Sequence, residues 1–301
     1  MRRLFILALL FVFSALPSPA RALLPASSFT YDASAPLDVR AAHSWQEGTT
    51  QFQDVTFAAG AGRRIHAQIV LPASSVSRPG VLFVHWLGDP KTTNLTEFLP
   101  DARALAKRGV ASVLVDAMWA APDWFDKGRS PDTDLADSIR QVVDLRRALD
   151  LLAAQPNVDP HAIAYVGHDF GAMYGAVLSG LDPRPQYYVF MAGTTSFSDW
   201  FLLGAQPKDK AAFVTQMAGI DPTGFLAQSG ARHFLFQFAL HDQYVKVSDA
   251  QRFAAAAPGE CGAFYYDADH GLAGAQILSD RLTWLESRLF ATSDTYSVTK
   301  P

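Results

Sequence analysis

The sequence is poor in cysteine, and this scarcity excludes a disulfide-stabilised fold. Cys261 is the single cysteine among 301 residues, so no intrachain disulfide can form, and no cysteine near the N-terminus is available to carry a lipid. The eight histidines show none of the spacings that mark a metal site. We therefore expect no metal, and nothing in the sequence calls for a cofactor.

Strong charge and long apolar runs are also lacking. Charged residues make up 18% of the chain and the formal net charge is −4, which disfavours nucleic acid or an anionic membrane as the partner. Beyond residue 22, no apolar run approaches the roughly 20 residues that a transmembrane helix requires. With 49% hydrophobic residues the chain has ample material for a sizeable core.

The first 22 residues differ from the rest. Arg2 and Arg3 precede the apolar run LFILALLFVF, and the small-residue stretch SPARA follows it. A basic start, an apolar segment of about ten residues and an A-x-A ending are typical of a secretory signal peptide. We predict cleavage after Ala22 and a periplasmic or secreted protein with no stable membrane association.

Periodicity divides the remaining chain into an extended lead-in, residues 23–50, one domain, residues 51–291, and a tail, residues 292–301. Within the domain, short apolar runs predict strands, and apolar residues three and four apart predict helices. The predicted strands cover 53–59, 63–72, 80–86, 110–117, 162–168, 186–192, 233–240 and 263–268. The predicted helices cover 94–108, 132–155, 171–181 and a last segment that carries Leu278, Leu282, Leu285 and Leu289.

Buried strands that alternate with amphipathic helices predict an α/β fold, with a mostly parallel central sheet and helices on both faces. Two local signals refine this expectation. Asn94 and Glu97 have the spacing of a capping box at the start of the first helix, with Pro100 as the point where that helix restarts and Gly109 at its end.

Polar residues stand at the ends of several predicted strands. The sequence Gly167-His168-Asp169-Phe170-Gly171 follows one strand, Asp242 follows another, and His270 comes after the last. In an open α/β sheet the carboxyl ends of the strands border a crevice, so we expect Asp169, Asp242 and His270 to meet there. Their order in the chain is nucleophile, acid, histidine.

These motifs resemble the α/β-hydrolase superfamily, and the compact chain resembles its dienelactone-hydrolase-like branch. The resemblance implies a small-molecule substrate. It also implies that residues 85–90, HWLGDP, form the oxyanion loop, with the backbone amides of Trp86, Leu87 and Phe170 as donors. Trp86 stands where this loop usually has glycine. In having an aspartate at the elbow, the chain resembles epoxide hydrolases and haloalkane dehalogenases. Those enzymes carry a large helical lid, whereas residues 191–230 of this chain leave room for only a minimal lid of short helices.

An aspartate changes the chemistry of this triad. Serine needs a base before it can attack, whereas aspartate, with a reference pKa of about 3.9, is already ionised at neutral pH. Asp169 is therefore suited to attack saturated carbon and form an alkyl ester. His270, oriented by Asp242, would then activate water to hydrolyse the ester, which predicts an epoxide or a carbon–halogen bond as the target.

Two alternatives stay open for the function. The first is an enzyme of the dienelactone-hydrolase or carboxylesterase type in which Asp169 does not act covalently. The second is a non-catalytic protein that has the same fold and binds small molecules. A cavity sealed at Asp169, or a His270 too distant to meet it, would favour the binding protein. For the acid, His241 and Asp249 are alternatives to Asp242.

Aromatic residues after the strand at 110–117 offer a binding surface. Trp119, Trp124 and Phe125 are predicted to wall an apolar substrate pocket, with plain core packing as the alternative. For His85 and His168, support of the neighbouring loops is the favoured interpretation over catalysis.

Overall fold

The computed structural model describes residues 22–60, 62–73 and 76–290. The predicted signal peptide, up to residue 21, and the C-terminal tail lie outside these residues, so both stay predictions. Within the described part of the chain, no helix combines the length and hydrophobicity needed to cross a membrane.

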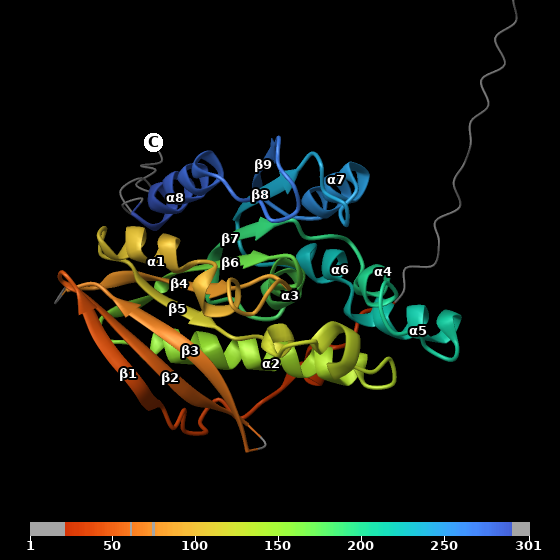
Figure 1. Cartoon of the computed structure of the whole chain (residues 1–301), viewed down its shortest axis with the longest axis horizontal. Coiled ribbons are helices and arrows are strands. Elements are labelled where there is room, and N and C mark those ends of the chain that lie inside the picture. The colour runs from red at the N-terminus through yellow and green to blue at the C-terminus, as the bar shows by residue number, and fades with distance from the viewer. Residues whose placement is uncertain (1–21, 61, 74–75, 291–301) are drawn as a thin grey trace, which may run out of the picture.

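A single mixed sheet organises the protein (Figure 1). The described residues contain nine strands in the order β1-β2-β3-β5-β4-β6-β7-β8-β9. Strands β1, β2, β3 and β5 pair antiparallel, and every other neighbouring pair is parallel. The strands are β1 (Arg40–Glu47), β2 (Thr50–Gly60), β3 (Arg63–Leu71), β4 (Arg78–Val84), β5 (Ala111–Val115), β6 (Val158–His168), β7 (Pro185–Met191), β8 (His233–Ala239) and β9 (Glu260–Tyr266).

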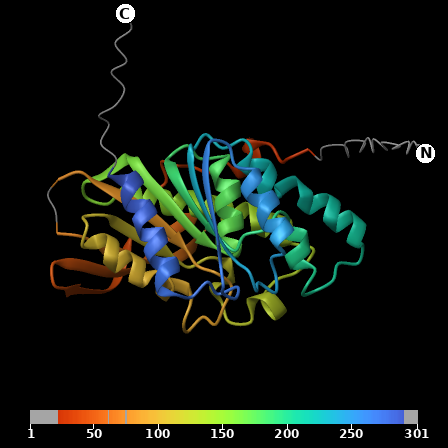
Figure 2. The same cartoon turned by 90° about the horizontal axis from the view of Figure 1, so that it is seen from above.

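Helices cover both faces of the sheet. Helices α1 and α8 lie together on one face, whereas α2, α3, α6 and α7 contribute to the larger core on the other face (Figures 1 and 2). The helices are α1 (Leu99–Ala106), α2 (Asp134–Ala153), α3 (Phe170–Ser179), α4 (Phe197–Phe201), α5 (Lys210–Met217), α6 (Pro222–Leu226), α7 (Val247–Ala255) and α8 (Ala275–Leu289). Short helical turns occupy Ala26–Phe29, Asn94–Thr96, Met118–Ala120, Trp124–Gly128 and Ala218–Ile220.

The predicted fold class is confirmed: a mostly parallel sheet carries helices on both faces. All seven residues of β4 are buried, as expected for a continuous apolar run between two layers of helices. The segment between β7 and β8 holds only the short helices α4, α5 and α6 and the helical turn Ala218–Ile220, in agreement with the minimal lid.

The sheet begins earlier than the sequence indicates. Residues predicted as an extended lead-in include β1, which pairs antiparallel with β2. Almost every side chain of β1 is exposed, so this edge strand has no buried face and therefore no apolar alternation that could reveal it.

The predicted capping box at Asn94 and Glu97 is wrong. Asn94 has a φ of 42° and donates its side-chain amide to the carbonyl of Ala120 at 3.0 Å. The helix α1 starts only at Leu99, with Pro100 in its first turn, and Glu97 points its carboxylate at other loops. The helix predicted over 94–108 starts late because proline is accepted in the first turn of a helix but not in its interior, so Pro100 cannot lie further inside.

A buried arginine anchors the lid. Arg129 contacts the carboxylate of Asp134 through Nε at 3.1 Å and Nη2 at 2.5 Å, and both side chains are 1% exposed. Its Nη1 donates to the carbonyl of Phe201 in α4 at 3.0 Å, and its guanidinium lies 4.6 Å from the Phe201 ring centroid. The ion pair therefore connects α4 of the lid to the start of α2.

We predict that Arg129→Met destabilises the protein by about 3–5 kcal/mol, because it leaves the Asp134 carboxylate buried without its partner. Chemical unfolding followed by circular dichroism measures this loss. Lys127→Met, which breaks the exposed pair between Lys127 and Asp123 nearby, is the control and leaves the midpoint nearly unchanged. Equal midpoints for the two variants would contradict the anchoring role.

Candidate active site

Asp169 occupies a sharp turn between β6 and α3. Its backbone has φ 59° and ψ −119°, a conformation that costs a non-glycine residue on the order of 1–3 kcal/mol. The flanking glycines are required by space: a Cβ on Gly167 would lie 2.4 Å from the carbonyl oxygen of Gly171, and a Cβ on Gly171 would lie 2.4 Å from that of Val84. The turn is thus the strained strand-to-helix elbow that the motif predicts.

The structure brings Asp169, His270 and Asp242 together at the carboxyl ends of β6, β9 and β8. The Nε2 atom of His270 is 3.8 Å from Oδ1 of Asp169, and its Nδ1 is 2.8 Å from Oδ2 of Asp242. The first distance is too long for a direct hydrogen bond and leaves an ion pair across a short gap. All three carboxylate and imidazole side chains are at least 93% buried.

The alternatives to Asp242 lie elsewhere. Asp249 pairs with Arg252, and the exposed ring of His241 pairs with Asp267. Asp242 is held in place by the backbone amides of Tyr244 and Val245, which donate to its Oδ1 at 2.8 and 2.9 Å. Its other oxygen is therefore free to face His270.

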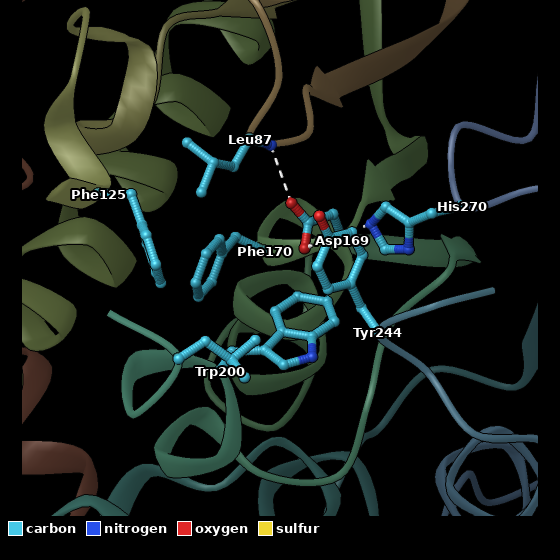
Figure 3. Close-up of a pocket in the computed structure, with 8 residues that line it drawn as sticks. Leu87, Phe125, Asp169, Phe170, Trp200, Tyr244 and His270 are labelled. Carbon is cyan, nitrogen blue, oxygen red and sulfur yellow. Dashed lines mark hydrogen bonds and ion pairs between the residues drawn. The ribbon is translucent and has the colours of Figure 1, made fainter. Parts of the chain in front are cut away.

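The loop after β4 supplies one donor to the elbow. The amide of Leu87 donates to Oδ2 of Asp169 at 2.8 Å, as Figure 3 shows. The amide of Trp86 points the other way and donates to Oε2 of Glu97 at 2.8 Å, so the expectation that Trp86 contributes an oxyanion donor is wrong. Phe170 is the first residue of α3, and its amide has no acceptor within the helix.

Charge determines the protonation of His270. Burial acts to lower its pKa, but the carboxylates of Asp169 and Asp242 outweigh burial and raise the pKa to about 9. Burial acts to raise the pKa of Asp242. The contact with His270 and the hydrogen bonds from two backbone amides outweigh burial, so the pKa of Asp242 is lowered overall. At neutral pH the site therefore holds an imidazolium between two carboxylates.

His85 supports the oxyanion loop, in line with its predicted packing role. It is 1% exposed, and burial lowers its pKa. Its Nε2 accepts from the amide of Ala117 at 3.1 Å, so Nδ1 carries the proton and donates to the carbonyl of Trp86 at 2.8 Å. The neutral ring thus fixes the loop after β4 to the loop after β5.

A small apolar cavity of about 160 Å³ opens over the Asp169 carboxylate. In Figure 3 this carboxylate stands between the Leu87 amide and the His270 ring, with Phe125, Phe170 and Trp200 gathered beside it. A cavity of about 150 Å³ holds a molecule the size of benzene. The lining is Leu87, Phe125, Asp169, Phe170, Trp200, Leu203, Tyr244 and His270.

Of the three predicted pocket aromatics, only Phe125 lines this cavity. Trp119 is 1% exposed, stacks on Tyr174 at 5.5 Å and donates its indole to the carbonyl of His85. Trp124 lies edge-on to Phe170 at 6.0 Å. Both indoles therefore form the core layer behind the pocket wall, and the prediction that they bind substrate is wrong.

Sequence reasoning missed Trp200, Leu203 and Tyr244. Trp200 and Leu203 come from the lid, whose irregular sequence gives no periodic signal, and Tyr244 follows Asp242 by two residues. The aromatic ring of Tyr244 lies edge-on to that of His270 at 4.9 Å. Placement after a candidate catalytic acid was the one sequence feature that could have marked Tyr244.

Across residues 22–60, 62–73 and 76–290, no cluster of three or more His, Cys, Asp or Glu side chains has the arrangement of a metal site. The cavity lining includes one carboxylate, Asp169, and one imidazole, His270, and neither lysine nor arginine. The titratable acid–base pair that faces the cavity is therefore Asp169 with His270.

Comparison with known proteins identifies the fold. No family model matches the chain. A polyketide transferase of Stachybotrys chlorohalonatus is 33% identical over 91 residues, which amount to 30% of this chain and only 29% of that protein. This match spans less than a third of the relative, so it transfers no activity.

Solved structures match over most of the chain. Acetyl xylan esterases from Paenibacillus sp. R4 and Thermoanaerobacterium sp. JW/SL YS485 superpose with TM-scores of 0.69 and 0.68, at 18% and 17% identity. The matches cover 84% and 85% of this chain, and 90% and 89% of those chains. A cold-adapted esterase from an Arctic intertidal metagenomic library matches at TM-score 0.63 and 16% identity, over 82% of this chain and 97% of that one. The chain has the α/β-hydrolase fold.

We predict that Asp169→Asn lowers the pKa of His270 from about 9, because one of the two carboxylates that stabilise the imidazolium loses its charge. Titration of the His270 ring by NMR measures the shift. Asp267→Asn, which removes an exposed carboxylate beside His241, is the matched control and leaves the pKa of His270 unchanged. An unchanged value in Asp169→Asn would show that the two groups do not interact.

Proposed function

We propose that the chain is a hydrolase that opens a small, neutral epoxide or carbon–halogen compound through a covalent ester of Asp169. The observation that carries the proposal is that the two oxygens of the Asp169 carboxylate have different contacts. Oδ2 accepts from the Leu87 amide at 2.8 Å, and Oδ1 faces His270 across 3.8 Å. One oxygen is thus fixed while the other is available to react.

In the first step, Oδ1 attacks a saturated carbon. The new bond is that between Oδ1 and the carbon, and the bond from this carbon to the halide or epoxide oxygen breaks, with its electron pair leaving on that atom. A halide leaves as an anion. An epoxide leaves an alkoxide that needs a proton, and the protonated His270, with its pKa raised to about 9, is a suitable source.

Formation of the ester converts His270 into a base. Asp169 no longer carries a charge, so the imidazolium loses part of its stabilisation and the pKa of His270 falls. The ring is neutral once its proton has passed to the epoxide alkoxide or, after a halide has left, to solvent. It then removes a proton from a water beside Asp169, and the hydroxide attacks the ester carbonyl. Negative charge develops on Oδ2, where the Leu87 amide already points, an interaction worth about 3 kcal/mol.

The proton balance closes over a full turnover of an epoxide. His270 gives its proton to the alkoxide in the first step and regains one from water in the second. As the intermediate collapses, the bond between the Asp169 carbonyl carbon and Oδ1 breaks, and Oδ1 leaves with the product. The remaining proton of the water passes to this leaving alkoxide, and the Asp169 carboxylate is restored. The product is a diol, and the site returns to an imidazolium between two carboxylates.

The cavity supports a neutral, compact substrate. Its volume of about 160 Å³ suits a molecule of benzene size, and its walls are mainly aromatic and aliphatic side chains. An anionic substrate would be repelled by the Asp169 carboxylate, and the His270 imidazolium in the lining is already paired with Asp169 and Asp242. The compact lid supports a likeness to the dienelactone-hydrolase-like branch, and the elbow sequence supports an aspartate nucleophile.

Ester or lactone hydrolysis is the second candidate, since the structural neighbours named above are esterases by title. Attack of a carboxylate on an ester would give a high-energy anhydride, so Asp169 would instead hold a water that His270 activates. Neither feature that would favour a purely binding protein is present, because the cavity reaches Asp169 and His270 lies beside it.

The N-terminal sequence supports export. The basic, apolar and small-residue pattern of residues 1–22 is that of a secretory leader, so we propose a periplasmic or secreted enzyme.

Two substitutions test the covalent route. With epoxides, haloalkanes, esters and lactones as substrates, Asp169→Asn loses turnover by at least about a thousandfold, because the amide is not a nucleophile. His270→Gln still forms the ester but does not hydrolyse it, and intact-protein mass spectrometry detects the adduct. Turnover at the wild-type rate in Asp169→Asn would rule out this residue as the nucleophile.

Isotope labelling separates the two candidate functions. Repeated turnover in ¹⁸O-labelled water places ¹⁸O in the Asp169 carboxylate if the ester forms, because hydrolysis occurs at the carbonyl carbon of Asp169. Digestion and mass spectrometry locate the label. Hydrolysis of esters with no label in Asp169 would favour the non-covalent route.

Charge selectivity gives an independent prediction. A neutral substrate has a kcat/KM at least about tenfold higher than an analogue with a carboxylate, because that group is repelled by Asp169. Leu203 lines the cavity and is 62% exposed, so Leu203→Lys adds a cation at its mouth and narrows the difference. Leu203→Met is the uncharged control. Equal kcat/KM values for the two substrates with the wild type would contradict the proposed substrate class.

A further inference from the structure

A second buried carboxylate–histidine pair lies directly behind the candidate active site. His168 immediately precedes Asp169, is fully buried, and places its Nδ1 2.6 Å from Oε1 of Glu97. The Glu97 side chain is 14% exposed. Neither residue lines the cavity over Asp169, so neither has a role in the chemistry proposed above.

We infer that Glu97 and His168 are positioning residues, which together hold the oxyanion loop and the backbone of His270 in register with Asp169. This inference rests on the proposed function for its catalytic meaning. The structural part of the inference is that the pair fixes the Leu87 amide and the His270 ring. That part depends on contacts within the protein, which do not involve the substrate.

The contacts form one continuous chain. Oε2 of Glu97 accepts from the amide of Trp86 at 2.8 Å, and Oε1 contacts Nδ1 of His168. On the far side of the ring, Nε2 of His168 lies 2.9 Å from the carbonyl oxygen of His270. Glu97 and His168 therefore connect the loop after β4, the elbow and the loop after β9.

Both ring nitrogens of His168 are engaged. Nδ1 faces the Glu97 carboxylate, and Nε2 faces the carbonyl oxygen of His270. A fully buried ring that is held at both nitrogens has a fixed orientation, so it can hold together the two segments that it contacts.

The pair also determines which amide reaches Asp169. The consecutive amides of Trp86 and Leu87 point in opposite directions, one to Glu97 and the other to the Asp169 carboxylate. By capturing the Trp86 amide, Glu97 turns the Leu87 amide toward Oδ2 of Asp169. Glu97 thus acts on the reacting carboxylate through the backbone of the loop.

Trp86 completes the arrangement. Its indole stacks on the ring of His168, with centroids 5.3 Å apart and planes at 18°, and lies 5.7 Å from the centroid of the His270 ring. The packing of its ring against both imidazoles explains why a tryptophan stands at a position where glycine is usual.

The test compares Glu97→Gln and His168→Gln with Asp101→Asn. The last variant breaks another buried ion pair, with Arg281, that contacts neither Asp169 nor His270. We expect each of the first two to lower kcat about tenfold or more with KM changed less than about threefold. The kcat of the double variant, Glu97→Gln with His168→Gln, is no lower than that of the less active single variant, because both substitutions break the same chain of contacts. Asp101→Asn lowers the melting temperature and leaves kcat unchanged.

A second readout does not depend on turnover. In NMR spectra of the folded variants, Glu97→Gln and His168→Gln shift the Leu87 amide resonance and the titration of the His270 ring, whereas Asp101→Asn shifts neither. If the wild type hydrolyses no substrate but these shifts occur, the proposed function fails and the positioning role stands. Wild-type kcat in both glutamine variants, or unshifted Leu87 and His270 signals, overturns the positioning role.

Discussion

The structure depends on one strained turn. Asp169 is held with φ 59° between β6 and α3, and the closeness of strand and helix at this point admits only glycine at positions 167 and 171. The strain is sustained because both elements are buried and the Asp169 amide donates to the carbonyl of Met191. In return, the carboxylate projects from the end of the sheet into a cavity instead of packing among the helices.

Charges of alternating sign make that buried carboxylate tolerable. Asp242, His270 and Asp169 form one row, and Glu97 with His168 forms a second pair beside it, the two imidazoles having centroids 5.6 Å apart. Isolated, the charges of Asp242, His270 and Asp169 would be costly to bury, but each has an opposite charge close by. The same pairing gives the site its chemistry, because a change of charge on Asp169 alters the proton affinity of His270.

The lid adds shape to this electrostatic site. Trp200 and Leu203 come from the segment around α4, and Arg129 fixes that segment to α2 through the carbonyl of Phe201. Phe170 stands between the cavity and the aromatic core that contains Trp119 and Trp124. The proposed preference for small apolar substrates rests on this aromatic wall beside Asp169, which is built without a separate lid domain.

The sequence by itself determined the fold class, most strands and helices, and the meeting of Asp169, Asp242 and His270. Strand ends follow from apolar periodicity, and a parallel sheet brings its carboxyl ends to one edge. Only the tertiary structure decided the direction of the Trp86 amide, the true partners of Glu97, the strand β1, and the roles of Trp119, Trp124, Trp200 and Tyr244. These depend on contacts between segments far apart in the chain, and local periodicity carries no information about which way a loop amide or an aromatic ring will turn.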